Sequence, residues 1–248
     1  MARQLIRIAH AYGNRRDRIS AAIEAGVDLI ETDLRYWRGE IWIRHEHRPT
    51  RLPLVYNVGL KPGIHREGPW AARVGKLFLR VDRAPIRFGE LLDRVSGRGG
   101  LLIDLKAAPY QPAVARAFVE RMFVELDGHR FEGALDFCGG WPLLDLVHAA
   151  RPDLPVHYSV DSLADWARLQ ARLSGPGRIP GISLRRDFID PERIATLRAA
   201  HVDYYCWDIK DARDASRAIE AGASGIIADD LVLLRNLAGT PVRDLEAQ

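Results

Sequence analysis

The sequence has few cysteines and no long apolar run. Among its 248 residues only Cys138 and Cys206 are cysteines, and they lie far apart. Two separated cysteines exclude a disulfide framework and a cysteine-rich metal site, so we expect buried free thiols. No window approaches the roughly 18 apolar residues of a transmembrane helix, and the start of the chain lacks the apolar core of a signal peptide. We therefore expect a cytoplasmic protein with no stable membrane anchor.

The charge balance is also modest. Lys and Arg number 36 against 33 Asp and Glu, which gives a net charge of +3. This surplus suits a small anionic substrate, but it is far from the dense basic surface of a nucleic-acid-binding protein. Apolar residues make up 47% of the chain and charged residues 28%, so we expect a core of ordinary size. The length matches one (β/α)8 barrel, although length alone also permits two small domains.

Three segments repeat one pattern of helix end, short turn and apolar strand. They are 25–33, 200–208 and 221–229, and each ends in Asp. Gly26 and Gly222 stand where a helix that ends in a left-handed residue favours glycine. Repeated helix–turn–strand units with an acidic residue at the strand end are typical of stacked βα units.

From this alternation we predict a single α/β domain over residues 1–248, folded as a (β/α)8 TIM-type barrel. The expected strands are 5–9, 29–33, 101–106, 134–138, 156–160, 181–184, 204–207 and 226–229, with an extra strand over 41–45 near the second. Expected helices include 112–125, 162–173 and 191–200, the last with Asp190 as its N-cap. Residues 46–85 are rich in Pro, Gly, His and Arg without a clear period, and we expect an irregular insertion over the barrel mouth.

Polar residues gather where the first strands end. His10 closes the first strand, Glu31 and Asp33 end the second, and His45 ends the run over 41–45. We expect these side chains at the carboxyl-terminal ends of three successive strands. That edge of a (β/α)8 barrel is where its enzymes keep their catalytic groups.

The acidic residues have the spacing of a metal site. Glu31 and Asp33 are two apart on a strand, so they share one face with Cα atoms ~6.6 Å apart. Asp104 and Lys106 repeat this spacing on the next strand. Carboxylates on one face repel, and a hard cation such as Ca or Mg relieves the repulsion. The alternative is a set of buried salt bridges. Acidic residues on two adjacent strands favour metal ligation by Glu31, Asp33 and Asp104, with Lys106 meeting an anion or the substrate.

His10 and His45 flank the carboxylates and suit one general acid and one general base. Each histidine alone would be read as structural. The remaining histidines lack such partners, although His47 lies close to the predicted site. Asp229 fits either the site or a helix cap, and Trp207 fits either a pocket wall or the core.

A set of segments keeps a recognisable order along the chain. It comprises His10, Asn14, 25–33, 39–45, 84–92, the acidic-x-Lys strand 102–106, and Trp207 with 225–229. Together these segments resemble the glycerophosphodiester phosphodiesterase family, with a looser match over 107–200. The resemblance implies a phospholipase-C-like barrel and metal-assisted cleavage of a glycerophosphodiester into glycerol 3-phosphate and an alcohol.

The resemblance also implies roles for individual residues. His10 and His45 match the family's acid–base pair, the three acidic residues match its metal ligands, and Lys106 matches its site lysine. Residues 46–85 match an insertion that helps to shape the substrate pocket.

Three positions depart from the family pattern. Ala11 stands where an arginine usually follows the first histidine, Glu46 replaces an Asp after the second, and Asp104 is shorter than the usual Glu. A small residue at position 11 cannot supply the bidentate fork of arginine. We expect weaker orientation of the phosphate there, and the nearby candidates to replace the guanidinium are Arg15, Arg16 and Arg44.

The sequence therefore predicts a divalent-metal-dependent phosphodiesterase that acts on a small anionic phosphodiester. Ca or Mg fits the oxygen ligands better than Zn, because no cysteine is near. Two alternatives stay open: a barrel that binds phosphodiesters or lipid head groups without turnover, and a metal-dependent hydrolase of another ester. The sequence leaves the head group, the nucleophile and the oligomeric state undetermined.

Overall fold

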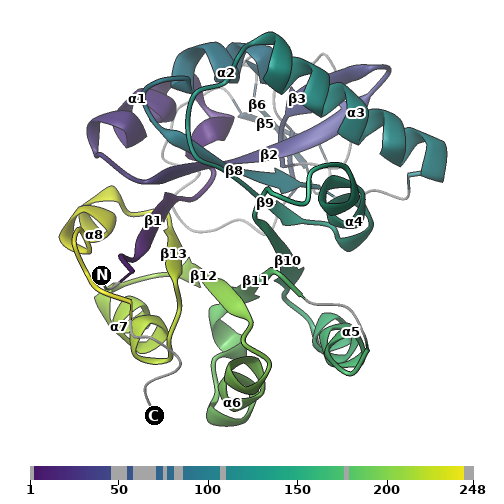
Figure 1. The fold of residues 1–248 in the computed structure, drawn as a ribbon. Helices are drawn as coiled ribbons and strands as arrows, with labels where there is room; N and C mark the ends of the chain where they lie inside the picture. The colour runs from purple at the N-terminus through teal and green to yellow at the C-terminus, as the bar shows by residue number, and fades with distance from the viewer. Residues whose placement is uncertain are drawn as a thin grey trace.

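The computed structural model contains a closed barrel of eight parallel strands with helices outside it (Figure 1). It describes residues 3–45, 86–106, 110–175 and 179–242, and the backbone of three short strands within 46–85. The barrel strands are β1 (Ile6–Ala9), β2 (Leu29–Trp37), β8 (Gly100–Leu105), β9 (Leu135–Gly139), β10 (Val156–Val160), β11 (Gly181–Arg185), β12 (Asp203–Ile209) and β13 (Gly225–Ala228). Pairing of β1 with both β13 and β2 closes the ring, which confirms the predicted TIM-type barrel.

Helices follow the barrel strands and cover the outside of the ring. They are α1 (Arg16–Glu24), α2 (Phe88–Val95), α3 (Pro112–Gly128), α4 (Trp141–Ala150), α5 (Leu163–Leu173), α6 (Pro191–Ala199), α7 (Ala212–Glu220) and α8 (Leu231–Asn236), with 3-10 turns η1 (Tyr12–Asn14) and η3 (Arg186–Phe188). Asp190 caps α6 by accepting from the Arg193 amide, as predicted. Ser162 caps α5 in the same way through the amide of Asp165.

The turns between helix and strand have the expected geometry. Gly26 has a φ of +63° and Gly222 a φ of +98°, both in the left-handed region. His201 occupies the equivalent turn with a φ of +50°. The three repeated segments therefore share a backbone turn, and only two of them fill it with glycine.

The extra strand differs from the prediction. β3 (Glu40–Ile43) runs antiparallel to the outer half of β2, and β7 (Ile86–Arg87) pairs with its other edge. The extra strand expected over 41–45 beside the second strand is therefore present, but it is antiparallel and ends at Ile43, two residues before His45. The turn at Arg38 and Gly39, with φ values of +51° and +82°, reverses the chain and returns it to the barrel.

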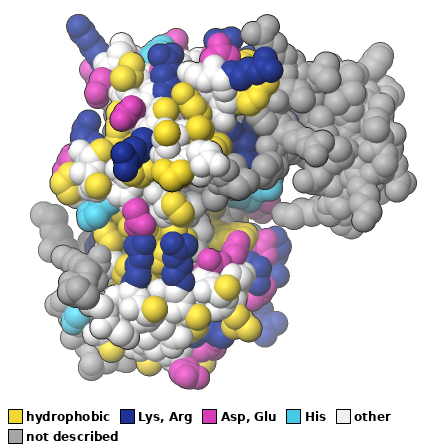
Figure 2. Space-filling model, turned by 90° about the vertical axis from the view of Figure 1, so that its right-hand side faces the viewer, with side chains coloured by type: hydrophobic (Ala, Val, Ile, Leu, Met, Phe, Trp, Pro, Cys, Tyr) yellow, Lys and Arg dark blue, Asp and Glu magenta, His cyan; other side chains and the backbone are white. Residues whose placement is uncertain are grey.

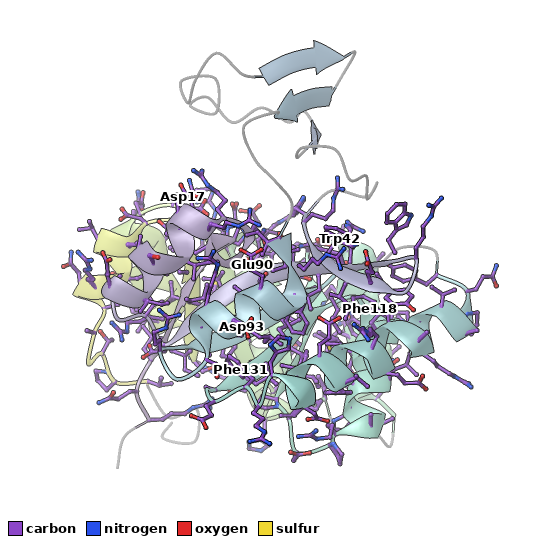
Figure 3. All side chains as sticks on the ribbon, turned by 90° about the horizontal axis from the view of Figure 1, so that it is seen from above. Asp17, Trp42, Glu90, Asp93, Phe118 and Phe131 are labelled. Atoms are coloured by element: carbon purple, nitrogen blue, oxygen red, sulfur yellow. The ribbon has the colours of Figure 1, made fainter. Side chains whose placement is uncertain are left out.

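The elements α2, α3 and β3 pack against one another on the outside of the barrel (Figure 3). Phe118 of α3 is fully buried there and stacks on Tyr36 of β2 with ring centroids 5.7 Å apart. Arg16 of α1 pairs with Glu90 of α2 at 2.7 Å and joins the two helices. Apolar packing and one ion pair thus fix the helices behind the first strands.

The lower barrel interior is filled by large side chains that face glycines. A Cβ at Gly181 would lie 2.6 Å from Nδ1 of His157, and one at Gly225 would lie 2.6 Å from Cδ1 of Tyr205. The Tyr205 hydroxyl donates to Asp136 at 2.5 Å, and the His157 ring stacks on Tyr205 with centroids 3.8 Å apart. These strands can approach closely because glycine leaves room for the neighbouring ring.

Residues 46–85 contribute a second, three-stranded antiparallel sheet of β4 (Val55–Asn57), β6 (Leu77–Arg80) and β5 (Ala71–Val74). The insertion was predicted to be irregular, so these paired strands are a difference from the expectation. The remainder of 46–85, and with it the predicted cover over the barrel mouth, lies outside the described residues.

The described surface agrees with the composition. Figure 2 shows basic and acidic side chains interspersed over the described part of one face. Among the helices described, none is both long and apolar enough to cross a membrane. Cys138 and Cys206 are free and buried, as predicted.

We predict that Gly225→Ala destabilises the barrel by about 1–3 kcal/mol, because the added methyl overpacks the Tyr205 ring. Urea unfolding measures this loss. Gly128→Ala at the end of α3 is the matched control, since its Cβ would meet nothing within 4 Å. It should leave stability unchanged or raise it by up to ~1 kcal/mol. Equal effects of the two substitutions would contradict the packing argument.

Candidate active site

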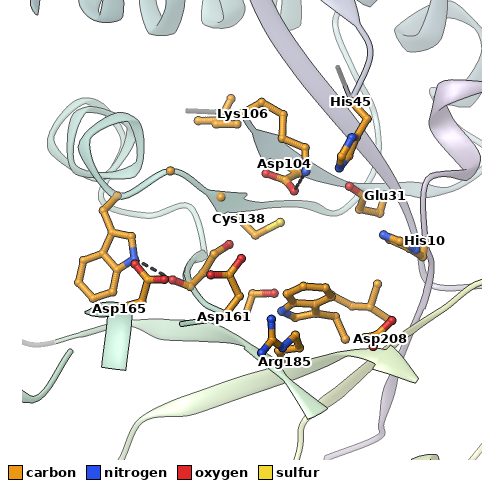
Figure 4. Close-up of a pocket in the computed structure, with 18 of the residues that line it drawn as sticks. His10, Glu31, His45, Asp104, Lys106, Cys138, Asp161, Asp165, Arg185 and Asp208 are labelled. Carbon is orange, nitrogen blue, oxygen red and sulfur yellow. Dashed lines mark hydrogen bonds and ion pairs between the residues drawn. The ribbon is translucent and has the colours of Figure 1, made fainter. Parts of the chain in front are cut away.

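Three carboxylates converge at the carboxyl end of β2 and β8 (Figure 4). Parallel pairing sets Asp33 directly beside Asp104, and Glu31 lies two residues earlier on the same face of β2. Ligand atoms of Glu31, Asp33 and Asp104 all lie within 4.8 Å of one another. Glu31 and Asp33 are buried, with 3% and 2% of their surface exposed. The structure therefore brings together the three predicted metal ligands.

Neighbouring groups hold these carboxylates in place. The Asn14 side-chain amide donates to Asp33 Oδ2, and its Oδ1 accepts the Asp33 backbone N–H at 2.9 Å. The Ala11 backbone N–H donates to Glu31 Oε2. Asn14 was part of the family resemblance but received no role from the sequence, because its contact requires η1 to fold against β2.

Lys106 lies between two of the carboxylates. Its Nζ is 2.7 Å from Asp33 Oδ1 and 2.5 Å from Asp104 Oδ2. The two sequence readings, a salt bridge and a site lysine, thus describe the same side chain. Burial would raise the pKa of Asp33, but the charges of Lys106 and His45 and the hydrogen bonds from Lys106 and Asn14 together lower that pKa to about 2. Burial and the Asp33 charge raise the pKa of Glu31 well above normal.

The donor set fits a hard divalent cation. Every candidate ligand atom is a carboxylate oxygen, and Ca and Mg prefer oxygen. A cation would also relieve the repulsion that raises the Glu31 pKa. Glu31, Asp33 and Asp104 are the residues that would hold it.

His10 is oriented by Asp229. Its Nδ1 lies 2.8 Å from Asp229 Oδ1, so its other ring nitrogen is left for the pocket. Burial would lower the pKa of His10, but the Asp229 hydrogen bond and the Glu31 charge raise it to about 9. Asp229 was predicted to serve either the site or a helix cap. It serves His10, while the next residue, Asp230, caps α8.

His45 lines the same pocket from the end of β3. The Arg35 guanidinium donates to its backbone carbonyl from Nε at 3.2 Å and from Nη2 at 2.7 Å. Loss of solvent at the barrel rim lowers the pKa of His45. The charge of Lys106 lowers it further, whereas the charge of Asp33 raises it. The two histidines therefore have opposite tendencies to carry a proton.

The pocket has a volume of about 720 Å³ and extends across the barrel mouth. Trp207, for which the sequence left a pocket wall and the core open, is one of the residues that line it. The opposite side carries charged residues that the sequence did not assign to the site, namely Asp161, Asp165, Arg185 and Asp208 (Figure 4). Their signal was their position after the later barrel strands. Arg168 also lines the pocket.

The arginines proposed to replace a guanidinium at position 11 lie elsewhere. Arg15 pairs with Asp17 at 2.6 Å, and Arg16 pairs with Glu90. Arg44 is buried, with 2% of its surface exposed. Within the described part of the chain, none of these three lines the pocket.

Solved structures share this architecture. An Oleispira antarctica phosphodiesterase in complex with the product sn-glycerol-3-phosphate superposes with a TM-score of 0.67 at 15% identity, over 95% of this chain and 96% of that one. A glycerophosphodiester phosphodiesterase from Thermotoga maritima gives 0.62 at 17% identity, over 96% and 100%. A Silicibacter pomeroyi protein provisionally assigned as a glycerophosphoryl diester phosphodiesterase gives 0.72 at 19% identity, over 95% and 92%.

The chain has the fold of glycerophosphodiester phosphodiesterases. No protein-family model matches the sequence, and no curated protein matches it either. At identities this low, the superposition establishes the barrel, and the chemistry must be argued from the site itself.

We predict that Ca²⁺ or Mg²⁺ stabilises the wild-type protein after chelator treatment, by about 2.7 kcal/mol at 100 times the dissociation constant. Thermal unfolding with separate metal additions measures the shift. Asp33→Asn should remove most of it, because one buried ligand charge is lost. Asp93→Asn is the control, since Asp93 pairs with His129 far from the pocket. An undiminished metal response in Asp33→Asn would refute the ligand assignment.

Proposed function

We propose that this protein is a divalent-metal-dependent phosphodiesterase that hydrolyses a glycerophosphodiester to glycerol 3-phosphate and an alcohol. The observation that carries the proposal is one pocket lined by His10, His45, Glu31 and Asp104. The buried Asp33 lies directly behind it, with a carboxylate oxygen within 4.8 Å of those of Glu31 and Asp104. The fold shared with a phosphodiesterase that binds sn-glycerol-3-phosphate supports this proposal by analogy. Ca²⁺ and Mg²⁺ are the cations that its oxygen ligands favour.

Glu31, Asp33 and Asp104 would hold a divalent cation, which would act as a Lewis acid on the phosphate and favour attack on phosphorus. Lys106 reduces the negative charge of the ligand set through its contacts with Asp33 and Asp104. Trp207 forms an apolar wall against which the substrate packs.

We assign His10 as the general acid. Asp229 accepts from its Nδ1 and stabilises the imidazolium, so the other ring nitrogen can protonate the departing alkoxide. The Tyr12 hydroxyl donates to the Asp229 backbone carbonyl at 3.0 Å and steadies this arrangement.

His45 is then the general base. It takes a proton from the nucleophile, which is either water or a neighbouring hydroxyl of the substrate. Burial lowers the pKa of His45, and the charges of Lys106 and Arg35 add to this effect against the opposing charges of Asp33 and Asp104. The ring therefore favours its neutral form, as a base at neutral pH requires. The Arg35 contacts with the His45 carbonyl fix where the ring enters the pocket.

We predict that His10→Ala and His45→Ala each reduce turnover of a glycerophosphodiester by about 100-fold or more. An aryl phosphodiester has a leaving group that needs no protonation. It should therefore restore His10→Ala towards wild-type turnover but leave His45→Ala impaired. Steady-state rates on both substrates, with metal present, measure this pattern.

His129→Ala is the matched control, because His129 also pairs through Nδ1 with an aspartate, at 2.6 Å, but outside the pocket. Its turnover should equal that of the wild type. Rescue of His45→Ala in place of His10→Ala would reverse the acid and base assignments. Binding of glycerophosphodiesters without any turnover by the wild type would favour a binding protein over an enzyme.

Ala11→Arg tests the choice of substrate. Ala11 already has a left-handed φ of +57°, so the larger side chain adds little backbone strain. A guanidinium beside His10 should raise kcat/KM for a glycerophosphodiester by about 10-fold or more, the scale of a charge-assisted hydrogen bond. Circular dichroism checks the fold. Normal folding with lower activity would show that another substrate group occupies this space, and would contradict the glycerophosphodiester assignment.

A further inference from the structure

The side of the pocket that carries the three carboxylates offers no net positive charge to balance the negative charge of a phosphodiester. Glu31, Asp33 and Asp104 supply three carboxylates, and Lys106 offsets one of them. A divalent cation would offset the other two, and Asp229 offsets the charge of a His10 imidazolium, so no net positive charge is left there for the substrate. Ala11, next to His10, offers only a backbone N–H, which Glu31 already accepts.

Two guanidiniums reach the pocket from its opposite side. Arg168 belongs to α5, is exposed, and places its guanidinium carbon 4.8 Å from the ring centre of Trp141. The guanidinium carbon of Arg185 also lies over an aromatic ring, 5.4 Å from the ring centre of Phe188, so exposure is what separates the two arginines. Arg185 is the last residue of β11 and is only partly exposed.

The strand itself directs Arg185 inward. Alternate residues of β11 face the barrel interior: Gly181 lies against His157, and Ser183 and Arg185 both line the pocket. Arg186 does not line the pocket; it pairs with Asp214 of α7, and its Nε also lies 3.5 Å from Oδ2 of the pocket residue Asp208. Arg185 is also the register partner of Trp207 on β12, which forms the adjoining wall.

Arg185 retains hydrogen-bonding capacity for a ligand. Its Nε is buried and makes no hydrogen bond within the described residues. The nearest carboxylate, Asp187, is 3.4 Å away and 59% exposed, so solvent screens that ion pair. Figure 4 shows Arg185 across the pocket from Glu31 and Asp104.

We propose that Arg185 binds the phosphate of the diester from the side opposite the carboxylates and fixes its orientation. The inference rests on the proposed function and adds a specificity-determining residue to it. Arginine suits this task because its planar fork can bind two phosphate oxygens at once. The phosphate would then lie between the carboxylate cluster and β11, with Trp207 beside it.

The test compares Arg185→Gln and Arg185→Lys with the wild type in the presence of metal. Calorimetric binding of sn-glycerol 3-phosphate should weaken about 10- to 100-fold in Arg185→Gln, and kcat/KM should fall by a similar factor. Arg185→Lys should recover part of the binding, since it keeps the charge but loses the fork. Arg186→Gln, which removes the neighbouring charge that does not line the pocket, should bind like the wild type.

Two substrates identify which group Arg185 contacts. Glycerophosphocholine carries a cationic head group and glycerophosphoglycerol a neutral one, so they share only the diester phosphate as an anion. Equal losses on both in Arg185→Gln support the proposal. A loss confined to one of the two would overturn it, because Arg185 would then contact the head group.

The outcomes separate this inference from the proposed function. An active wild type whose Arg185→Gln variant binds and turns over substrate equally well would overturn the role of Arg185 alone. A wild type without phosphodiesterase activity that still binds sn-glycerol 3-phosphate through Arg185 would overturn the proposed function and retain the phosphate site.

Discussion

The site depends on the repulsion among three carboxylates that strand pairing forces together. The parallel register of β2 and β8 places Asp33 beside Asp104, and the two-residue repeat of β2 adds Glu31 on the same face. Burying such a cluster costs free energy unless each oxygen finds a partner. Lys106, Asn14 and the Ala11 amide supply those partners in the absence of a ligand. The three carboxylates still offer oxygens close enough together to bind one divalent cation.

The rest of the barrel keeps this cluster rigid. Below it, Leu102, Tyr205 and Ile227 fill the interior, and glycines on neighbouring strands admit the larger rings. The Asp136–Tyr205 hydrogen bond ties β9 to β12 across the lower interior. Outside, the Arg16–Glu90 pair and the Phe118 contacts hold α1, α2 and α3 against the first strands. The strand ends that carry the site therefore have little freedom to separate under their mutual repulsion.

Much of this could be predicted from the sequence, because its signals are local. Strand and helix periods, the Asp190 cap and the turn at Gly26 each depend on a few adjacent residues. The two-residue spacing of Glu31 and Asp33 fixed their common face in the same way. Asp104 could be placed beside them only through the alternation of the whole barrel.

Other features depend on partners distant in the sequence. The direction of β3 was missed because the Arg38–Gly39 turn lacks the Asn-Gly or Asp-Gly pair that marks a tight hairpin. The pairing of His10 with Asp229 spans almost the full chain and appears only when β13 closes the ring on β1. The one local signal for Arg185 was its position at the end of a predicted strand, and that signal is weak because an arginine there is equally common on a solvated surface. Its inward direction follows from the barrel register.

The hairpin of β2 and β3 gives the two histidines unequal supports. His10 follows β1, a barrel strand that is hydrogen-bonded to a neighbour on both edges, so it shares the stability of the barrel. His45 follows a strand outside the ring, and Arg35 and the Arg44 amide hold it there. The chain then enters 46–85 directly from His45. Changes in the length or sequence of that insertion would therefore alter the position of His45 before that of His10. Substrate preference could then change in evolution while the barrel keeps its geometry.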